Sequence, residues 1–384
     1  MKSMQEKDML PAGLYLLSLI RAALLDTPAT PRPDSVSWEQ VWTLAKAHRM
    51  EAIAAHAIQK MEDKPPQELW QVWQELPALA VYRESLYQLE WKKLSDALRR
   101  ENLRYLLLKG EELSAMYPQP GMRHMADRDV LYARMDGMAD AEAFDTLQTV
   151  MASLGYQLHE KGPVHDVFTK PPFFCFEMHK RIFGQWRHFG DGKANPWEHA
   201  VSVDGYLWSL SLEHRFIYFM AHACKHYENR GCGIRLLADT YVYLKHTRQH
   251  EFDWQAVWRA FRALDMERFA ERIISLAERC FGDDDWSPDP AEQTLLMTLL
   301  TAGIYGNNER LLQNLSMQHG GKASTLHGRL ILLRQKVFPP YTIMAYQYPI
   351  LEKHRWLAPL CWMYRSLRLL MRHWRVLDWF RKTT

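Results

Sequence analysis

The stretch that decides the fold is LRYLLLKGEELSAMYPQPGMRHMADRDVLYA, residues 103–133. Its apolar run Tyr105–Leu108 is short and uninterrupted, as is typical of a buried central strand, and it ends at Lys109-Gly110, where a tight loop is expected. The segment Glu111–Tyr117 predicts a short helix, which the prolines after it close. Asp127–Ala133 predicts a second strand. The stretch therefore forms the centre of an α/β unit.

The residues that follow extend this unit. Met138–Leu154 has helical spacing, and Gly155 is placed to cap its end. Val164–Thr169 and Phe173–His179 predict two paired strands joined by the turn at Pro171-Pro172. Between residues 103 and 180, strands thus alternate with helices, which indicates a small α/β unit.

Helices are expected on both sides of this core. Apolar residues recur at helical spacing from Leu10 to Leu24, and helical patterns return from about Ser209 to the end of the chain. Breaks are predicted at Asn229–Gly233, Gly282–Pro290, Gly320–Gly321 and Pro339–Pro340. We therefore expect an α+β protein that is mostly helical, with an N-terminal helical region (1–100), an α/β core with a small mixed sheet (101–205) and a C-terminal helical region (206–384).

Composition and charge exclude several classes of protein. The 384 residues have 47% hydrophobic and 24% charged side chains, which is ordinary for a folded globular protein. A formal net charge of +3 gives no general affinity for polyanions. The five cysteines contain no C-x-x-C pair, which favours a reducing compartment over a disulfide framework. No uninterrupted apolar run reaches the roughly 18 residues of a membrane span, so a cytoplasmic location is expected.

Asp127 and Asp129 are the first candidates for chemistry. Side chains alternate along a strand, so these two carboxylates project from the same face, a few ångströms apart. Two such close negative charges repel one another unless a cation neutralises them, and oxygen ligands favour a hard ion such as Mg²⁺. On its own the pair also fits a solvated strand end. Together with the residues below, it predicts a site for a divalent metal.

A third carboxylate and a set of cations complete the candidate site. Glu177 lies on the polar face of its strand, between Cys175 and His179, where it can reach the two aspartates. Three carboxylates can hold two metal ions, which bind a triphosphate and activate a hydroxyl. Lys109-Gly110 suits phosphate binding, because glycine lets backbone N–H groups approach and lysine supplies positive charge. Arg123 is a second phosphate candidate.

These elements occur together in a known family. The sequence resembles the uncharacterised bacterial nucleotidyltransferase-like family of the polymerase-beta superfamily. The resemblance rests on Leu107-Leu108-Lys109-Gly110, Tyr117-Pro118, Arg123, Asp127-x-Asp129 and Phe176-Glu177-x-His179, and continues in His222-x-x-Lys225-His226, Arg235-x-x-x-Asp239 and the stretch from Phe338-Pro339-Pro340 to Tyr348-Pro349. It spans roughly residues 40 to 370, and its specific part is 106–179.

The resemblance implies an enzyme that transfers a nucleoside monophosphate from an NTP, with Mg²⁺ or Mn²⁺, to a hydroxyl or phosphate of an acceptor. The acceptor is not identified and ranges over a sugar, a metabolite, a modified peptide and an RNA end. Asp127, Asp129 and Glu177 would be catalytic metal ligands. Nucleotide contacts would come from Lys109, Gly110, Arg123, His179, Lys225 and Arg235. The alternative is a catalytically inactive nucleotidyltransferase-like protein that binds a nucleotide or a partner.

Two departures from the family pattern bear on that alternative. The loop has Glu111-Glu112 where the superfamily commonly has a Gly-Ser or Gly-Gly pair, and these acids would repel a triphosphate if they faced it. Arg128 replaces the usual aliphatic residue between the aspartates and would point to the other face of the sheet. It forms a buried ion pair there, or it marks a decayed site.

Two further patterns leave alternatives open. His222 and His226, with Cys224 and Cys232 near them, have a spacing that can bind zinc, but Cys224 falls on another side of the helix, which favours a face lining the cleft. Arg235 and Asp239 stand four residues apart and can simply pair with each other.

The last alternative concerns the tail. From Lys353 to Lys382 arginines alternate with tryptophans, a composition found in membrane-surface and nucleic-acid contacts. A docked terminal helix with solvated arginines is the favoured interpretation.

Overall fold

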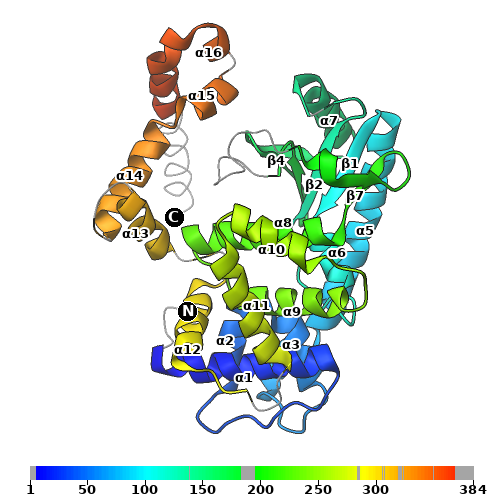
Figure 1. The fold of residues 1–384 in the computed structure, drawn as a ribbon, viewed down its shortest axis with the longest axis vertical. Helices are drawn as coiled ribbons and strands as arrows, with labels where there is room; N and C mark the ends of the chain where they lie inside the picture. The colour runs from blue at the N-terminus through cyan, green and yellow to red at the C-terminus, as the bar shows by residue number, and fades with distance from the viewer. Residues whose placement is uncertain are drawn as a thin grey trace. The chain divides into compact units, whose positions relative to one another are not determined.

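The computed structural model describes residues 6–137, 139–182, 195–282, 286–304, 306, 308–318, 322, 324–348 and 350–367. They belong to two compact units (Figure 1). The first comprises the residues up to His159 and Val164–Asn307, and the second comprises Glu160–Pro163 and the residues from Asn308 onward. The sites discussed below lie in the first unit.

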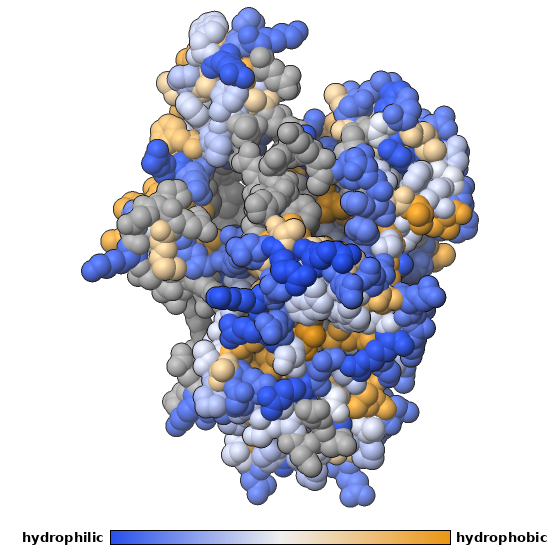
Figure 2. Space-filling view, in the orientation of Figure 1, coloured by the Kyte–Doolittle hydropathy of each residue, from blue (hydrophilic) through white to orange (hydrophobic). Residues whose placement is uncertain are grey.

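Helices precede and follow the sheet of the first unit. Before it come α1 (Glu6–Leu25), α2 (Trp38–His48), α3 (Glu51–Ile58), α4 (Gln67–Gln74) and α5 (Leu76–Arg100); after it come α8 (Leu212–Asn229), α9 (Arg235–Thr247), α10 (Trp254–Ala263), α11 (Glu267–Gly282) and α12 (Pro290–Ala302). The predicted breaks at Asn229–Gly233 and Gly282–Pro290 fall between α8 and α9 and between α11 and α12. The visible face over α8 and α10 is mainly hydrophilic (Figure 2), because α10 turns Val257 and Phe261 into the core.

Helix α1 is long and apolar enough to cross a membrane by length and composition, although it contains no uninterrupted apolar run of that length. In the structure, 61% of its apolar window is buried, and Leu16, Leu19 and Ile20 lie fully inside the core. A buried core helix meets the same criteria, so packing accounts for the apolar composition of α1.

The described strands form one mixed sheet in the order β3-β4-β5-β2-β1-β7-β6. Their bounds are β1 (Leu103–Leu108), β2 (Arg128–Arg134), β3 (Gln157–Lys161), β4 (His165–Lys170), β5 (Phe174–His179), β6 (Ala200–Ser202) and β7 (Leu207–Leu210), with α6 (Gly110–Ala115) after β1 and α7 (Ala141–Ser153) after β2. Strand β2 is antiparallel to β1 and parallel to β5. The predicted fold class, mostly helical with a small mixed sheet between helical regions, is confirmed.

Three strands were not expected from the sequence. Strands β3, β6 and β7 are short and lie in the outer part of the sheet, and the helical pattern was expected to begin at about Ser209. Ser209 instead belongs to β7, which pairs in parallel with β1, and α8 begins only after Ser211, whose side chain accepts a hydrogen bond from the backbone of His214. Strand β7 forms because it pairs with β1, about a hundred residues earlier, and not because of a pattern within its own few residues, so the sequence gives no local sign of it.

The sheet separates two hydrophobic cores, and the alternation along β2 decides which residues face each. Val130 and Tyr132 join the core formed with α5 and α7, whereas Leu131 and Ala133 join the core formed with the N-terminal helices and α8–α12. Because alternate residues share a face, Asp129 lies on the side of Leu131. The same alternation on β5 sends Phe174, Phe176 and Met178 to the first core and leaves Glu177 on the other face.

The second unit contains helices only among its described elements after residue 307: α13 (Asn308–Gln318), α14 (Thr325–Val337), α15 (Tyr341–Gln347), α16 (Ile350–Lys353) and the 3₁₀ helix Arg355–Leu357. The predicted break at Pro339–Pro340 falls between α14 and α15. The break at Gly320–Gly321 and the tail from residue 368 lie outside the described residues, so the interpretation of the tail stays a prediction.

Candidate active site

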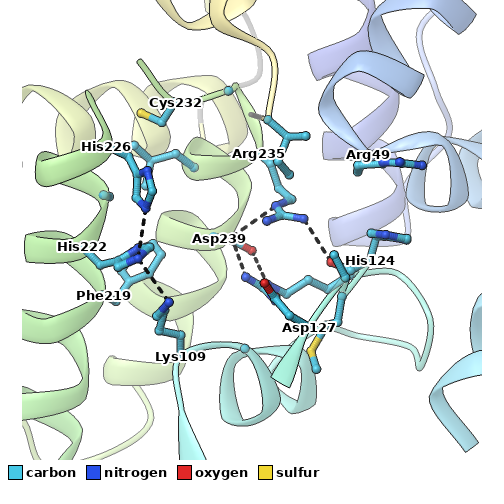
Figure 3. A pocket seen from close by; sticks show the side chains of 18 of the residues that line it. Arg49, Lys109, His124, Asp127, Phe219, His222, His226, Cys232, Arg235 and Asp239 are labelled. Carbon is cyan, nitrogen blue, oxygen red and sulfur yellow. Dashed lines mark hydrogen bonds and ion pairs between the residues drawn. The ribbon is translucent and has the colours of Figure 1, made fainter. Parts of the chain in front are cut away.

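A cavity of about 270 Å³ lies between the ends of β1 and β2 and the helices α8 and α9 (Figure 3). Residues at the ends of β1 and β2 form one wall, called the sheet wall. Residues of α8 and α9, together with Arg49 and the loop residue Arg123, form the other, called the helical wall. Charged and imidazole side chains predominate among its polar lining: Arg49, Lys109, Arg123, His124, Asp127, Asp129, His222, His226, Arg235 and Asp239.

The acids of the sheet wall are placed by strand register. Asp127 immediately precedes β2, Asp129 is its second residue, and Asp129 stands opposite Glu177 of the parallel neighbour β5. Nε2 of His179 lies 2.8 Å from an Asp129 oxygen and 3.7 Å from a Glu177 oxygen, so these carboxylates are no farther apart than the sum of the two distances. The structure thus brings the three predicted acids together, although Glu177 is not among the residues that line the cavity.

Lys109 reaches this wall through an unusual backbone conformation. Continued alternation along β1 would send its side chain to the opposite face of the sheet. Its φ of 46° and ψ of −85° end the strand and redirect the side chain. The Nζ lies 3.1 Å from Asp129 Oδ2 and 3.1 Å from His222 Nε2. A positive φ is disfavoured in a lysine, and such conformations concentrate at functional sites.

Gly110, the next residue, also lines the cavity. A Cβ added to it would lie 3.3 Å from Met125 Sδ and 3.4 Å from an Arg123 nitrogen. The close approach of these side chains therefore favours glycine at this position.

The two aspartates differ in their electrostatic surroundings. Burial alone would raise the pKa of Asp129, but the Lys109 ammonium and the hydrogen bond to His179 outweigh burial and hold it far below its usual range. For Asp127, burial and the charges of Asp129 and Glu177 raise the pKa to about 6. Among the described residues, Asp127 has no hydrogen-bond or ion-pair partner. The cations Lys109 and Arg235 lower the pKa of Asp127 less than burial and the two acids raise it, so the negative charge of Asp127 is only partly compensated.

The predicted nucleotide ligand His179 lies beside the acids rather than in the lining of the cavity. Its Nε2 bonds Asp129, and its Nδ1 lies 3.3 Å from the carbonyl oxygen of Arg181. Burial lowers the pKa of His179, but the hydrogen bonds to Asp129 and Glu177 prevail and raise it. His179 thus positions the carboxylates among which it lies.

The helical wall centres on Asp239 of α9. Arg123 donates to both of its oxygens, at 2.8 and 3.2 Å, and the Tyr117 hydroxyl donates at 2.7 Å. Arg235 lies 3.8 Å from Asp239 and donates to the carbonyl oxygen of His124 at 3.0 Å. The pairing of Arg235 with Asp239, left open by the sequence, is therefore only a secondary contact. The bidentate contact with Asp239 holds the Arg123 guanidinium at the cavity.

Helix α8 supplies two histidines and one lysine. His222 and His226 line the cavity, with their Nε2 atoms 3.1 Å apart, whereas Lys225 is not among its lining residues. Burial and the nearby Lys109 lower the pKa of both histidines, that of His226 to about 4. Cys224 is buried in the core. The ammonium of Lys109 faces the His222 nitrogen, which is a different arrangement from histidines and cysteines that converge on zinc.

The side chains that depart from the family pattern, Arg128 and the two glutamates, all form ion pairs. Arg128 is buried on the far face of the sheet, where it pairs with Glu84 at 2.8 Å and with Glu111 and lies over the ring of Tyr87. Glu112 pairs with Arg215 at 3.2 Å. Neither glutamate lines the cavity, so neither repels an anion bound there. Arg128 forms the buried ion pair that was one of its two interpretations.

Two of the charged and imidazole lining residues, Arg49 and His124, were missed by the sequence analysis. Arg49 follows α2 in a left-handed conformation, with φ of 55°, which turns the chain into α3. His124 precedes β2, and burial together with Arg235 and Arg49 lowers its pKa to about 4. Neither residue belongs to a periodic pattern or to a motif; they reach the cavity through tertiary packing (Figure 3).

Comparison with known proteins gives one match. A family model described as an uncharacterised nucleotidyltransferase matches residues 34–282. The match includes the predicted site residues from Lys109 to Arg235 as well as Arg49. No curated protein and no solved structure matches the chain.

Proposed function

The chain belongs to the uncharacterised nucleotidyltransferase family, and from this premise we propose that it transfers a nucleoside monophosphate from an NTP to a hydroxyl or phosphate of an acceptor, using Mg²⁺ or Mn²⁺. Membership of the family implies an NTP substrate, and nucleotidyltransferases typically use divalent metals. The motifs resemble those of the polymerase-beta superfamily, which supports the same reaction class.

The observation that carries the proposal is Asp127, which lines the cavity beside Asp129 and has no ion-pair partner among the described residues. A carboxylate whose pKa is raised to about 6 by burial and by two neighbouring acids is a site that favours a cation. Oxygen ligands in this number suit a hard divalent ion. The donor set therefore fits Mg²⁺ or Mn²⁺, which Asp127, Asp129 and Glu177 would hold. Such an ion neutralises phosphate charge and lowers the pKa of an acceptor hydroxyl.

The chain's own side chains would bind and orient the substrates. Arg49, Arg235 and Arg123 line the same cavity as Asp127 and Asp129, where guanidinium groups can bind phosphate oxygens. Asp239 and Tyr117 keep Arg123 in place, so it is oriented before a ligand arrives. Lys109, at the boundary between the walls, can move from Asp129 to a phosphate. Glu177 is our candidate for the base that accepts the proton of the acceptor hydroxyl.

One observation favours the binding-only alternative. Both oxygens of Asp129 are already occupied, one by Lys109 at 3.1 Å and the other by His179 at 2.8 Å. If Lys109 never leaves Asp129, the ammonium takes the place of a metal, and the cavity binds a nucleotide or a partner without transferring anything. The two functions differ in whether a metal is required.

The test is a screen of the four radiolabelled NTPs with Mg²⁺ or Mn²⁺ against cell extract, with transfer of label as the readout. We expect label transfer by the wild type and its loss both in chelator and in Asp127→Asn. This variant is chosen because Asp127 has no ion-pair partner among the described residues whose loss would disturb the fold. In parallel, NTP with metal should raise the Tm of the wild type as its concentration rises. A Tm shift that is the same with and without metal, and no label transfer, would establish the binding-only alternative.

A further inference from the structure

We propose that His165, Glu177 and His179 form a binding site for a transition-metal dication, next to the oxygen-ligand site of the aspartates. The three ligand atoms lie within 4.8 Å of one another. The proposal deepens the proposed function, on which it rests only in that Glu177 would serve both sites. It was not apparent from the sequence, because His165 belongs to no motif.

Strand pairing fixes the positions of His165, Glu177 and His179 relative to one another. His165 opens β4 and His179 ends β5, and the two stand directly opposite in the antiparallel ladder. Glu177 lies two residues before His179 and therefore on the same face. His165 Nε2 and His179 Nε2 are 3.6 and 3.7 Å from the same oxygen, Glu177 Oε2. Bonds of roughly 2.0–2.2 Å to a shared ion place ligand atoms about this far apart, so small rotations of the side chains complete the site.

The orientation of His179 is the one that a metal ligand requires. A carbonyl oxygen can only accept, so the Nδ1 of His179 carries the proton directed at the carbonyl of Arg181, 3.3 Å away. Hydrogen bonding of the other ring nitrogen in this way is the usual support of a metal-bound histidine. The Nε2 then points at the oxygens of Asp129 and Glu177, among which a cation is favourable.

The ligand chemistry selects the kind of metal. Mg²⁺ prefers oxygen ligands and retains its water, whereas imidazole nitrogen suits ions such as Fe²⁺, Ni²⁺ and Zn²⁺. Mn²⁺ serves below as the paramagnetic probe of the same mixed nitrogen and oxygen site. A metal on His179 Nε2 would displace the proton that this atom donates to Asp129 Oδ1 and release it to solvent. The Asp129 oxygen would then be available to the ion of the neighbouring site, so the first metal prepares the second position.

The test uses Mn²⁺ alone, added to the full-length protein without nucleotide. Continuous-wave electron paramagnetic resonance measures bound against free Mn²⁺, and pulsed methods detect couplings to nitrogen nuclei bound to the ion. We expect couplings from the two histidine ligands, and we expect them to persist in excess Mg²⁺, which displaces Mn²⁺ from oxygen ligands. Retained Mn²⁺ without nitrogen couplings would overturn the proposal, as would complete displacement by Mg²⁺.

A matched pair of variants locates the ligand. Asparagine lacks an atom at the Nε2 position, so His165→Asn should remove one nitrogen coupling. The affinity for Mn²⁺ should fall at least about tenfold, because even residues that only support the metal ligands contribute that much. His159→Asn, at an exposed position on the neighbouring strand β3, should change neither. Equal spectra for His165→Asn and the wild type would overturn the assignment. If His165→Asn does not fold, the wild-type spectrum decides, with fewer than two coupled nitrogens counting against the site.

The outcome is independent of the transfer reaction. Nitrogen couplings without label transfer would leave the metal site in place and reject the proposed function. Label transfer in Mg²⁺ without nitrogen couplings in Mn²⁺ would support the proposed function and reject the histidine metal site.

Discussion

Along the sheet wall of the cavity, the functional side chains come from neighbouring strands in fixed register, whereas along the helical wall they come from segments far apart in the sequence. Asp129 and Glu177 face each other because β2 and β5 pair in parallel. Arg49, Arg123 and Arg235 meet only because the turn between α2 and α3, the loop before β2 and the start of α9 surround the same space. Each wall has one buried acid, Asp129 or Asp239, that holds cations in place.

This difference suggests a division of tasks. Metal ligands require separations set to fractions of an ångström, which neighbouring strands provide. Phosphate ligands tolerate more variation, because an arginine can approach a phosphate oxygen from several directions. Variants of the two walls should therefore fail in different ways, and the following predictions test this, from the largest expected effect to the smallest.

The largest effect is expected for Asp129→Asn on the sheet wall. The substitution leaves the partly buried Lys109 ammonium without its acid and replaces the charged acceptor of the His179 hydrogen bond by a neutral one. Loss of one partner of a buried pair costs about 3–5 kcal/mol of unfolding free energy. Label transfer should also fall by about 10³-fold or more, through loss of a metal ligand. Denaturant unfolding and single-turnover transfer measure the two effects; a variant as stable as the wild type would contradict the importance of the Lys109 pair.

On the helical wall, Asp239→Asn is the counterpart. It deprives Arg123 of its bidentate partner but leaves Asp127, Asp129 and Glu177, the proposed metal ligands, unchanged. We expect a loss of about 2–4 kcal/mol in stability, because Arg123 is nearly buried. The KM for the NTP should rise, while kcat falls much less than in Asp129→Asn. A collapse of kcat with unchanged KM would remove the distinction between the walls.

Asp127→Asn should stabilise the metal-free protein, in contrast to Asp129→Asn. The pKa of Asp127 in the folded protein is raised to about 6, so its stability contribution is complete at low pH and is lost as pH rises through that value. The gain in the variant should therefore be absent near the unfolded pKa of about 4 and reach at most about 3 kcal/mol at pH 8. Unfolding free energies at the two pH values measure this; a gain independent of pH would assign the effect to another group.

The smallest effect is expected for Arg49→Gln. Among the described residues, the Arg49 side chain has no hydrogen-bond or ion-pair partner, so Tm should stay unchanged. NTP affinity should fall about tenfold, the contribution of one charge-assisted hydrogen bond. Arg100→Gln, an exposed arginine at the end of α5, serves as the matched control for the change of charge. Equal affinities of the two variants would exclude Arg49 from the nucleotide site.

The contrast between the walls also explains how much the sequence could predict. Alternation along two strands was enough to place Asp127, Asp129 and Glu177 together and to send Arg128 to the other face. The sequence treated the two aspartates as equivalent repelling charges. The structure separates them, because the left-handed turn at Lys109 gives Asp129, and not Asp127, a direct ion pair with the lysine. No periodic pattern encodes that turn, and none connects Arg49 or His165 to the acids.

The near balance of opposite charges around the cavity has a consequence for how a ligand arrives. Arg49, Lys109, Arg123 and Arg235 are set against Asp127, Asp129 and Asp239 at short range, so their fields largely cancel beyond about one Debye length. Such a cavity does not steer a polyanion through solution, and the rate of association should depend only weakly on ionic strength. It selects at contact, and it suits a nucleotide whose phosphates are already neutralised by their own metal.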